Sequence, residues 1–266
     1  MPFTLAHPAA AIPLRRALGR FGILPALILG SLAPDLTYFL PVSIERATTH
    51  TIDAVFWFCV PATTLAYVIY DRLLLGPIIF LLPASIRARL GPPLPHALTP
   101  HLMLAVCVSA AAGAFTHVAW DSFTHGSGAA VRALPALRVL VAEFGGYRLW
   151  TYKIVQHSST IGGSLLLAYW SWRWFQSTPP IPTPPASPFP NVVRLSFIPA
   201  SLFLSVLVGC ARAAQRASDI VSISTLQVFL KYAAVSFIAT FVVLLIVLAI
   251  GWKLRSHIHD AKGRTS

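Results

Sequence analysis

Long apolar runs dominate the chain. A membrane-spanning helix needs about 20 predominantly apolar residues, and four runs fit that length: Asp53–Tyr70, His101–Trp120, Val193–Ala211 and Val228–Trp252. They are continuous, and so differ from the alternating strands of about 10 residues found in a membrane β-barrel. The pattern therefore predicts an all-α, polytopic helical membrane protein.

Three further segments refine this prediction. Ile161–Phe175 is a shorter, fifth candidate span, and its tryptophan-rich end is typical of a membrane interface. Phe21–Phe39 is apolar but interrupted, which predicts a half-helix that turns at Gly30 and Pro34. Leu73–Leu90 ends in basic residues and resembles an interfacial amphipathic helix. We expect about five transmembrane helices plus an N-terminal half-helix and an interfacial helix.

A proline-rich stretch, residues 177–191, divides the chain, because a segment with so many prolines is extended. The expected organisation is a helical membrane domain at 1–176, this linker, a transmembrane helix pair at 192–252 and a basic tail at 253–266.

Composition excludes a soluble domain. Hydrophobic residues make up 56% of the chain and charged residues 11%, whereas soluble domains carry about 25% charged residues. The net charge of +12 comes from basic residues placed singly or in pairs between apolar runs. That placement indicates contact with anionic lipid and no nucleic-acid partner. We expect a multi-pass protein of a membrane, the cell membrane in a prokaryote, with the lipid bilayer as its partner.

Ionisable side chains near membrane segments are costly and mark functional sites. In the stretch FTHVAWDSFTH, His117, Asp121 and His125 recur every fourth residue. On a helix they would share one face. Imidazole and carboxylate groups are ligands for zinc and other divalent metals, so this spacing predicts a metal site.

Further candidates occur at the ends of other segments: His7, Asp35, His50 and His157. His157 precedes Ser158 and Ser159, either of which would cap the following helix and leave His157 at its N-terminus. The alternative is structural, because a lone His or Asp at a helix end is more often a cap, and His117 with Asp121 could brace two helices. Among the other polar residues, Asp71 is expected at the surface beside Arg72, with His96 solvated.

Six ordered motifs carry a resemblance to a known family. TLAHPAAAIPLRR, GSLAPDLTYFL, THT, SIRARL, THVAWDSFTHGSG and VQHSSTIGG resemble the membrane proteins catalogued as domain of unknown function 4184. The resemblance extends from the N-terminus to about Trp174. It implies a helical membrane fold and no particular activity.

A looser resemblance is to membrane-bound metal-dependent hydrolases of the LexA-regulated inner-membrane type, and beyond them to zinc-dependent phospholipases C. It implies that the metal ligands are His7, Asp35, His50, His117 and Asp121. His125 and His157 belong to the closer family's pattern. Ala47, Thr48 and Thr49 precede His50 where those hydrolases have a His-Arg pair.

Two functions follow. The first is a metal-dependent hydrolase at the membrane surface, acting on a phosphoester or a lipid. A divalent metal, with zinc as the candidate, would activate water. Asp35 or Asp121 would act as ligand or base, and Arg46 or Arg148 would bind the substrate phosphate.

The second is a non-catalytic membrane protein whose His/Asp cluster is structural or conducts protons or metal ions. A position of Asp35 and His117 in the middle of a span would favour transport. Convergence in a surface pocket would favour hydrolysis.

Overall fold

The computed structural model describes residues 4–39, 44–145, 147–216 and 223–262. The last four residues of the expected basic tail, 263–266, lie outside the described residues. The chain divides into two compact units. Unit 1 comprises Met1–Tyr67, Ala97–Trp174 and Ser222–Ser224, and unit 2 comprises Val68–His96, Phe175–Val221 and Thr225–Ser266.

Four helical stretches are long and apolar enough to cross a membrane: Ile52–Leu81, Pro100–Ala133, Asn191–Gln215 and Val228–Leu254. They contain the four strongest predicted spans, which are thereby confirmed as helices long and apolar enough to cross a membrane. The protein is an all-α, multi-pass membrane protein, with helices accounting for nearly all of its regular structure.

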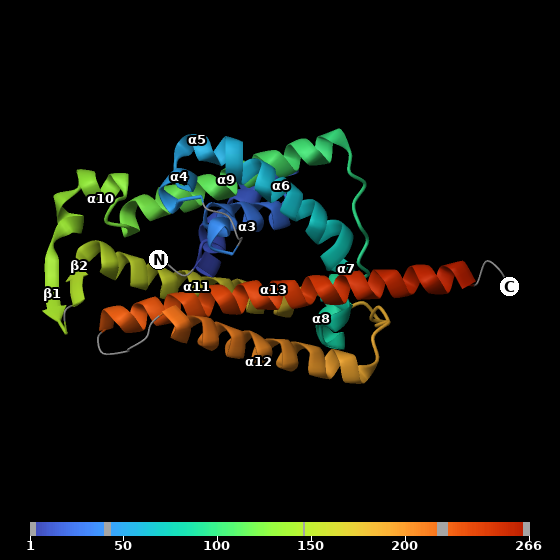
Figure 1. Ribbon diagram of the computed structural model, residues 1–266. Coiled ribbons are helices and arrows are strands. Elements are labelled where there is room, and N and C mark those ends of the chain that lie inside the picture. Colours follow the sequence, from blue (N-terminus) through green and yellow to red (C-terminus); the bar gives the residue numbers. More distant parts are fainter. Residues whose placement is uncertain (1–3, 40–43, 146, 217–222, 263–266) are drawn as a thin grey trace. The chain divides into compact units, whose positions relative to one another are not determined.

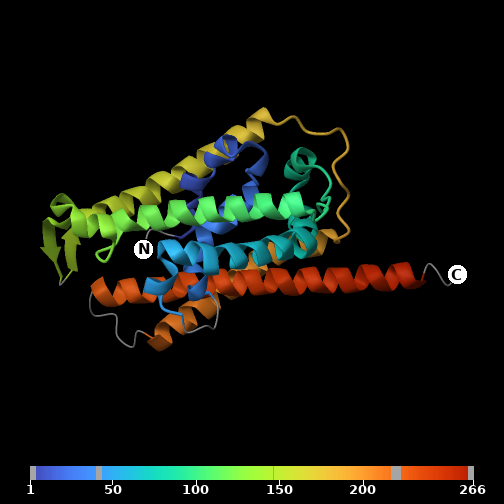
Figure 2. The ribbon, with the colours of Figure 1, turned by 90° about the horizontal axis from the view of Figure 1, so that it is seen from above.

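Unit 1 is organised around α9 (Pro100–Thr124). Thr99 caps this helix by accepting a hydrogen bond from the N–H of Leu102 at 3.2 Å, and Pro100 occupies its first position, as expected at a helix N-terminus. Beside α9 lies the helical stretch that begins with α5 (Ile52–Ala54) and continues into α6 (Val60–Ile69) (Figure 2).

The half-helix is α3 (Leu24–Leu32), which packs closely against α9 (Figure 1). Nine residues rise about 13.5 Å, much less than the hydrocarbon core of about 30 Å. A Cβ on Gly30 would lie 2.5 Å from the Ala110 carbonyl oxygen, so glycine permits the close approach. Gly30 lies inside the helix, and the predicted turn at Gly30 is therefore wrong. Pro34, the other residue predicted to make the turn, lies in the 3₁₀-helix Ala33–Tyr38, which begins where α3 ends.

Short elements surround this pair. They are the 3₁₀-helix Thr4–Ala6, α1 (Pro8–Ala11), α2 (Leu14–Ala17), the 3₁₀-helix Gly19–Phe21 and α4 (Arg46–Thr49). A buried core formed by Ala33, Val55, Cys59 and Ala114 packs the 3₁₀-helix Ala33–Tyr38 and the π-helical turn Val55–Cys59 against α9. Segments distant in sequence are thus fixed near the C-terminal end of α9.

After α9 the chain forms α10 (Ala129–Ala133), the 3₁₀-helix Pro135–Arg138 and an antiparallel hairpin of β1 (Leu140–Phe144) and β2 (Tyr147–Trp150). The helical prediction did not include this hairpin. The next helix, α11, extends over Thr151–Ser177. Its first residue, Thr151, therefore lies seven residues before Ser158 and eight before Ser159, the two predicted caps. It contains the fifth candidate span, Ile161–Phe175, and is not among the four helices apolar enough to cross a membrane.

Unit 2 corrects the expected interfacial helix. The segment Leu73–Leu90 is two elements. Its apolar half continues the preceding helix through the π-helical turn Tyr70–Leu74 into α7 (Leu75–Leu81), and only α8 (Ala84–Leu90) is separate. A second π-helical turn, Val55–Cys59, lies earlier in the same stretch, within unit 1.

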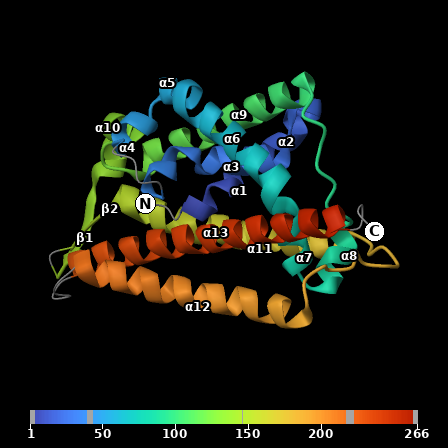
Figure 3. The ribbon, with the colours of Figure 1, turned by 45° about the vertical axis from the view of Figure 1, so that its right-hand side comes forward.

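The remainder of unit 2 is a helix pair. Residues 178–190 have no regular helix, and α12 (Asn191–Arg216) and α13 (Ile223–Lys262) then run side by side (Figure 3). Gly209 permits their close contact, because a Cβ there would lie 2.7 Å from the Ala233 carbonyl oxygen.

Candidate metal centre

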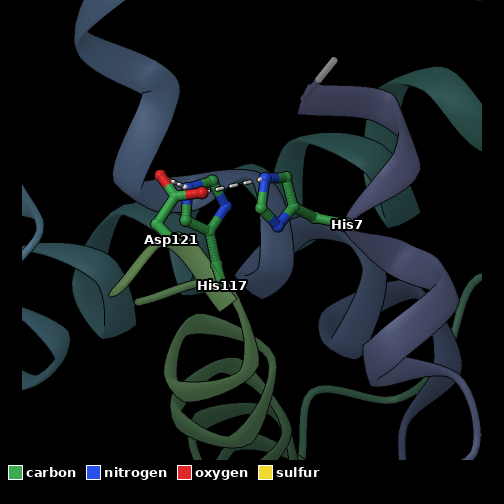
Figure 4. A group of neighbouring side chains, drawn as sticks. All are labelled: His7, His117 and Asp121. Atoms are coloured by element: carbon green, nitrogen blue, oxygen red, sulfur yellow. Dashed lines mark ion pairs between the residues drawn. The ribbon is translucent and has the colours of Figure 1, made fainter. Parts of the chain in front are cut away.

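A cluster of histidine and aspartate side chains lies at the C-terminal end of α9. His117 and Asp121 project from its last two turns toward His7, which precedes α1 (Figure 4). Asp35 comes from the 3₁₀-helix after α3, and His50 from the end of α4. All five are largely buried, with His117 fully so.

Backbone carbonyls orient the two central imidazoles. Nδ1–H of His117 donates to the carbonyl oxygen of Ser31 at 2.7 Å, and Nδ1–H of His50 donates to that of Arg46 at 3.0 Å. Ser31 lies in the last turn of α3, where carbonyls have no partner within the helix. With Nδ1 protonated, the lone pair of each neutral ring is on Nε2. The two Nε2 atoms face each other at 3.2 Å.

Two carboxylates complete this arrangement. Nε2 of His50 lies 3.3 Å from Oδ1 of Asp35 and 3.4 Å from Oδ2 of Asp121. Nε2 of His117 lies 3.9 Å and 3.4 Å from the same two oxygens. The cluster therefore brings electron-pair donors together, and a proton or a metal ion among them would be stabilised.

These separations suit a metal ion. Tetrahedral zinc bonds of about 2.0–2.1 Å put neighbouring ligand atoms about 3.3–3.4 Å apart. Two overlapping sets, His7 with His117 and Asp121, and Asp35 with His50 and His117, each offer one ligand atom per residue within 4.8 Å of the others.

His7 adds a further imidazole. Its ring stacks on that of His117, with centroids 3.7 Å apart and planes inclined by 15°. Burial, followed by the neighbouring His117, lowers the pKa of His7 to about 3, so the ring is neutral. Its Nε2 is buried 3.6 Å from Oδ1 of Asp121 and has no hydrogen-bond partner among the described residues.

Asp35 and His50 each shift the pKa of the other. Burial alone would raise the pKa of Asp35, but contacts with His50 and with the Thr4 hydroxyl, which donates to Oδ2 at 2.6 Å, lower it to about 2. Burial disfavours a charge on His50, yet Asp121 and Asp35 outweigh it and raise the pKa of His50. The site stabilises anionic carboxylates and attracts a cation.

His125 takes part differently from the prediction. Instead of continuing the helical face, it ends α9 with an extended backbone. Its Nδ1 still lies 3.5 Å from Oδ1 of Asp121, and its Nε2 lies 3.4 Å from the side-chain nitrogen of Gln156.

The structure does not bring His157 to the cluster. His157 is exposed in the second turn of α11, whereas the preceding residue, Gln156, is buried and faces His125. Adjacent residues on a helix point about 100° apart, and the earlier start of α11 puts His157 inside the helix, away from its N-terminus.

The two candidate arginines lie in different surroundings. Arg46 forms an ion pair with Oδ2 of Asp121 and is the most exposed member of the cluster, at 24% of its side chain. Arg148 instead pairs with Glu143 across the hairpin, with Nε 3.2 Å from Oε2.

Sequence reasoning did not identify three supporting residues: Thr4, Thr49 and Gln156. Thr49 donates to the Pro34 carbonyl oxygen at 2.9 Å and thereby fixes the adjacent His50 beside Asp35. In the sequence, Thr4 and Thr49 stand beside or near candidate histidines, in TLAHP and ATTHT, and that proximity was the available signal.

Comparison with known proteins gives one match. The family model described as Domain of unknown function (DUF4184) matches residues 1–250. No curated protein and no solved structure matches the chain, and the resemblance to metal-dependent hydrolases receives no support from these comparisons. Because the match covers nearly the whole length, the chain belongs to the DUF4184 family of domains of unknown function.

Proposed function

We propose that this protein is a metal-dependent hydrolase that acts at the membrane surface on a phosphoester or a lipid. The observation that carries the proposal is the facing pair of imidazole Nε2 atoms, 3.2 Å apart, with an oxygen of Asp121 3.4 Å from each. Two nitrogen donors and a carboxylate are a ligand set found in catalytic zinc sites.

The chain's own residues supply the ligands and their orientation. His50, His117 and Asp121 would hold the ion, with Asp35 close enough to join them. Carbonyl groups orient both imidazoles, as outer partners of metal-binding histidines commonly do. A bound divalent metal would lower the pKa of a water molecule and stabilise negative charge on a substrate oxygen.

The remaining groups have separate roles. Arg46 neutralises Asp121 and, as the exposed edge of the cluster, is positioned to contact an anionic substrate oxygen. Oδ1 of Asp35 is buried without a hydrogen-bond partner among the described residues, so it can donate an electron pair to a metal ion or accept a proton.

The position of the cluster favours hydrolysis over conduction. Its residues gather at the end of α9 among short elements that do not span a membrane. Between His101 and His117, α9 carries no His, Asp, Glu, Lys or Arg. A path for protons or ions across the membrane uses such groups along its length.

Hydrolysis by purified protein tests the proposal. Chelator-treated protein, with and without added zinc, would be assayed on p-nitrophenyl phosphate, bis(p-nitrophenyl) phosphate and micellar phosphatidylglycerol. We expect zinc-dependent cleavage of at least one substrate. His117→Ala should reduce it by at least about a hundredfold, since even supporting residues of metal sites contribute 10–100-fold.

His101→Ala is the matched control, because it removes the same side chain from the same helix outside the cluster. It should retain the wild-type rate. Activity that persists in His117→Ala, or an absence of zinc-dependent cleavage of all three substrates, would contradict the proposal.

A further inference from the structure

An apolar cavity of about 320 Å³ adjoins the cluster within unit 1. It lies between α1, the C-terminal part of α9 and the middle of α11. Its walls are formed by Ala6, His7, Ala9, Ala10, Trp120, Ser159, Gly163 and Leu166.

The walls offer almost no polar contact. The hydroxyl of Ser159 donates to the carbonyl oxygen of Gln156 at 2.9 Å, on its own helix. Among the described residues of the lining, His7 is the only titratable one. Three alanines and Gly163 leave space that larger side chains would fill. A Cβ on Gly163 would lie 3.1 Å from the Ala6 carbonyl oxygen, so α11 approaches this segment closely.

His7 connects the cavity to the cluster. It lines the cavity and also stacks on His117, with its Nε2 3.6 Å from Oδ1 of Asp121. This Nε2 is buried and without a hydrogen-bond partner among the described residues. A molecule in the cavity would therefore have one end beside the candidate metal ligands.

The surroundings favour a hydrocarbon occupant. Ile161, Leu165 and Leu166 on α11 are exposed apolar side chains, at 63%, 66% and 39%, in a protein that spans a membrane. Leu166 belongs both to this surface and to the cavity wall. The volume is at the lower end of the range of about 300–1,000 Å³ for ligand pockets, which suits one chain of a lipid.

We infer that this cavity binds the hydrocarbon chain of an amphiphilic substrate whose polar, phosphate-bearing end lies at the His/Asp cluster. The inference rests on the proposed function, since it names the substrate class of the same site. The unbranched chain packs against the apolar walls and is stabilised there by the hydrophobic effect. His7 marks the boundary between its apolar and polar ends.

Photolabelling tests this assignment. The probe is dodecyl phosphate with a diazirine in the middle of its chain, added to zinc-treated protein in phosphatidylcholine nanodiscs. Labelled residues would be located by mass spectrometry. We expect labels on Ala6–Ala10 and on α11 near Gly163, and excess unlabelled dodecyl phosphate should suppress them.

Two variants fill the cavity from opposite walls: Ala10→Phe on α1 and Leu166→Trp on α11. Both positions are exposed, so the larger side chains need not displace the core. Each should reduce labelling of Ala6–Ala10 by about tenfold, the factor expected when about two buried methylene contacts are lost. The control is Ala17→Phe, an exposed alanine of α2 outside the lining, which should leave labelling unchanged.

Zinc content is measured on the same samples, which separates two kinds of failure. Protein that binds zinc but is labelled only on the exposed surface of α11, or whose labelling is unaffected by both filling variants, would overturn the cavity assignment alone. Protein that is labelled as expected but binds no zinc would support a chain-binding cavity and contradict the proposed function.

Discussion

Unit 1 and unit 2 each bury an aspartate against histidine, with different results. In unit 2 the Asp71 carboxylate is buried and surrounded by donors: the backbone N–H of His96 at 3.2 Å, its Nδ1 at 2.7 Å and Nε of Arg72 at 3.4 Å. In unit 1 Asp121 forms one ion pair, with Arg46, and otherwise faces the Nε2 atoms of His50 and His117.

The balance of donors and acceptors distinguishes the two groups. Around Asp71 the donors match the acceptors, so the group is complete without any added ion. The expectation that Asp71 is a surface residue is wrong, because His96 and Arg72 compensate its burial. In the cluster, acceptors converge and buried atoms of His7 and Asp35 have no hydrogen-bond partner among the described residues. Such a surplus of acceptors favours a bound cation.

The largest effect should come from metal removal. A chelator should lower the thermal stability of zinc-loaded wild-type protein, because a ligand at 100 times its Kd adds about 2.7 kcal/mol. His117→Ala should show no chelator-dependent shift. Thermal unfolding followed by circular dichroism, with and without chelator, measures both. An identical shift in the two proteins would place the bound metal elsewhere.

Asp71→Asn should have the next largest effect, and only on stability. The amide replaces one acceptor oxygen with a donor that faces N–H groups, at a cost of about 1–3 kcal/mol. Its zinc content should equal that of the wild type. If Asp71→Asn lost zinc as readily as a cluster variant, the distinction between the two regions would fail.

Thr4→Val should weaken zinc binding without abolishing it. The Thr4 hydroxyl orients Asp35, and removal of such an outer partner raises the Kd by about tenfold or more. Competition with a zinc-sensitive dye would determine the Kd. Thr64→Val is a matched control, since the Thr64 hydroxyl donates to the Val60 carbonyl of its own helix. Equal effects of both variants would contradict an orienting role.

The smallest effects are expected from His157→Ala and Arg148→Ala. Both positions were candidates by sequence, and the structure places His157 at the surface and Arg148 in an exposed pair with Glu143. Zinc affinity should remain within about twofold of the wild type. A clear loss in His157→Ala would show that α11 presents this residue to the site.

The sequence was sufficient for the membrane class and the four strongest spans, because continuous apolar runs respond directly to the bilayer. Helical spacing also predicted that His117 and Asp121, whose side chains are of types that bind metals, lie on one face of a helix. It could not predict the hairpin, which depends on pairing between β1 and β2, or the start of α11. That shift decides whether His157 or Gln156 faces the cluster. The backbone carbonyl groups that orient the histidines, such as that of Ser31, cannot be recognised from the side chains of their residues.

We propose that the cluster at the end of α9 is a metal-binding ligand set. Elemental analysis of detergent-purified wild type, Asp121→Asn and Asp71→Asn measures whether it holds an ion. We predict about one zinc or other divalent ion per chain in wild type and Asp71→Asn, and essentially none in Asp121→Asn, since a metal site needs its anionic ligand. Absence of metal from the wild type, or undiminished metal in Asp121→Asn, would contradict the claim.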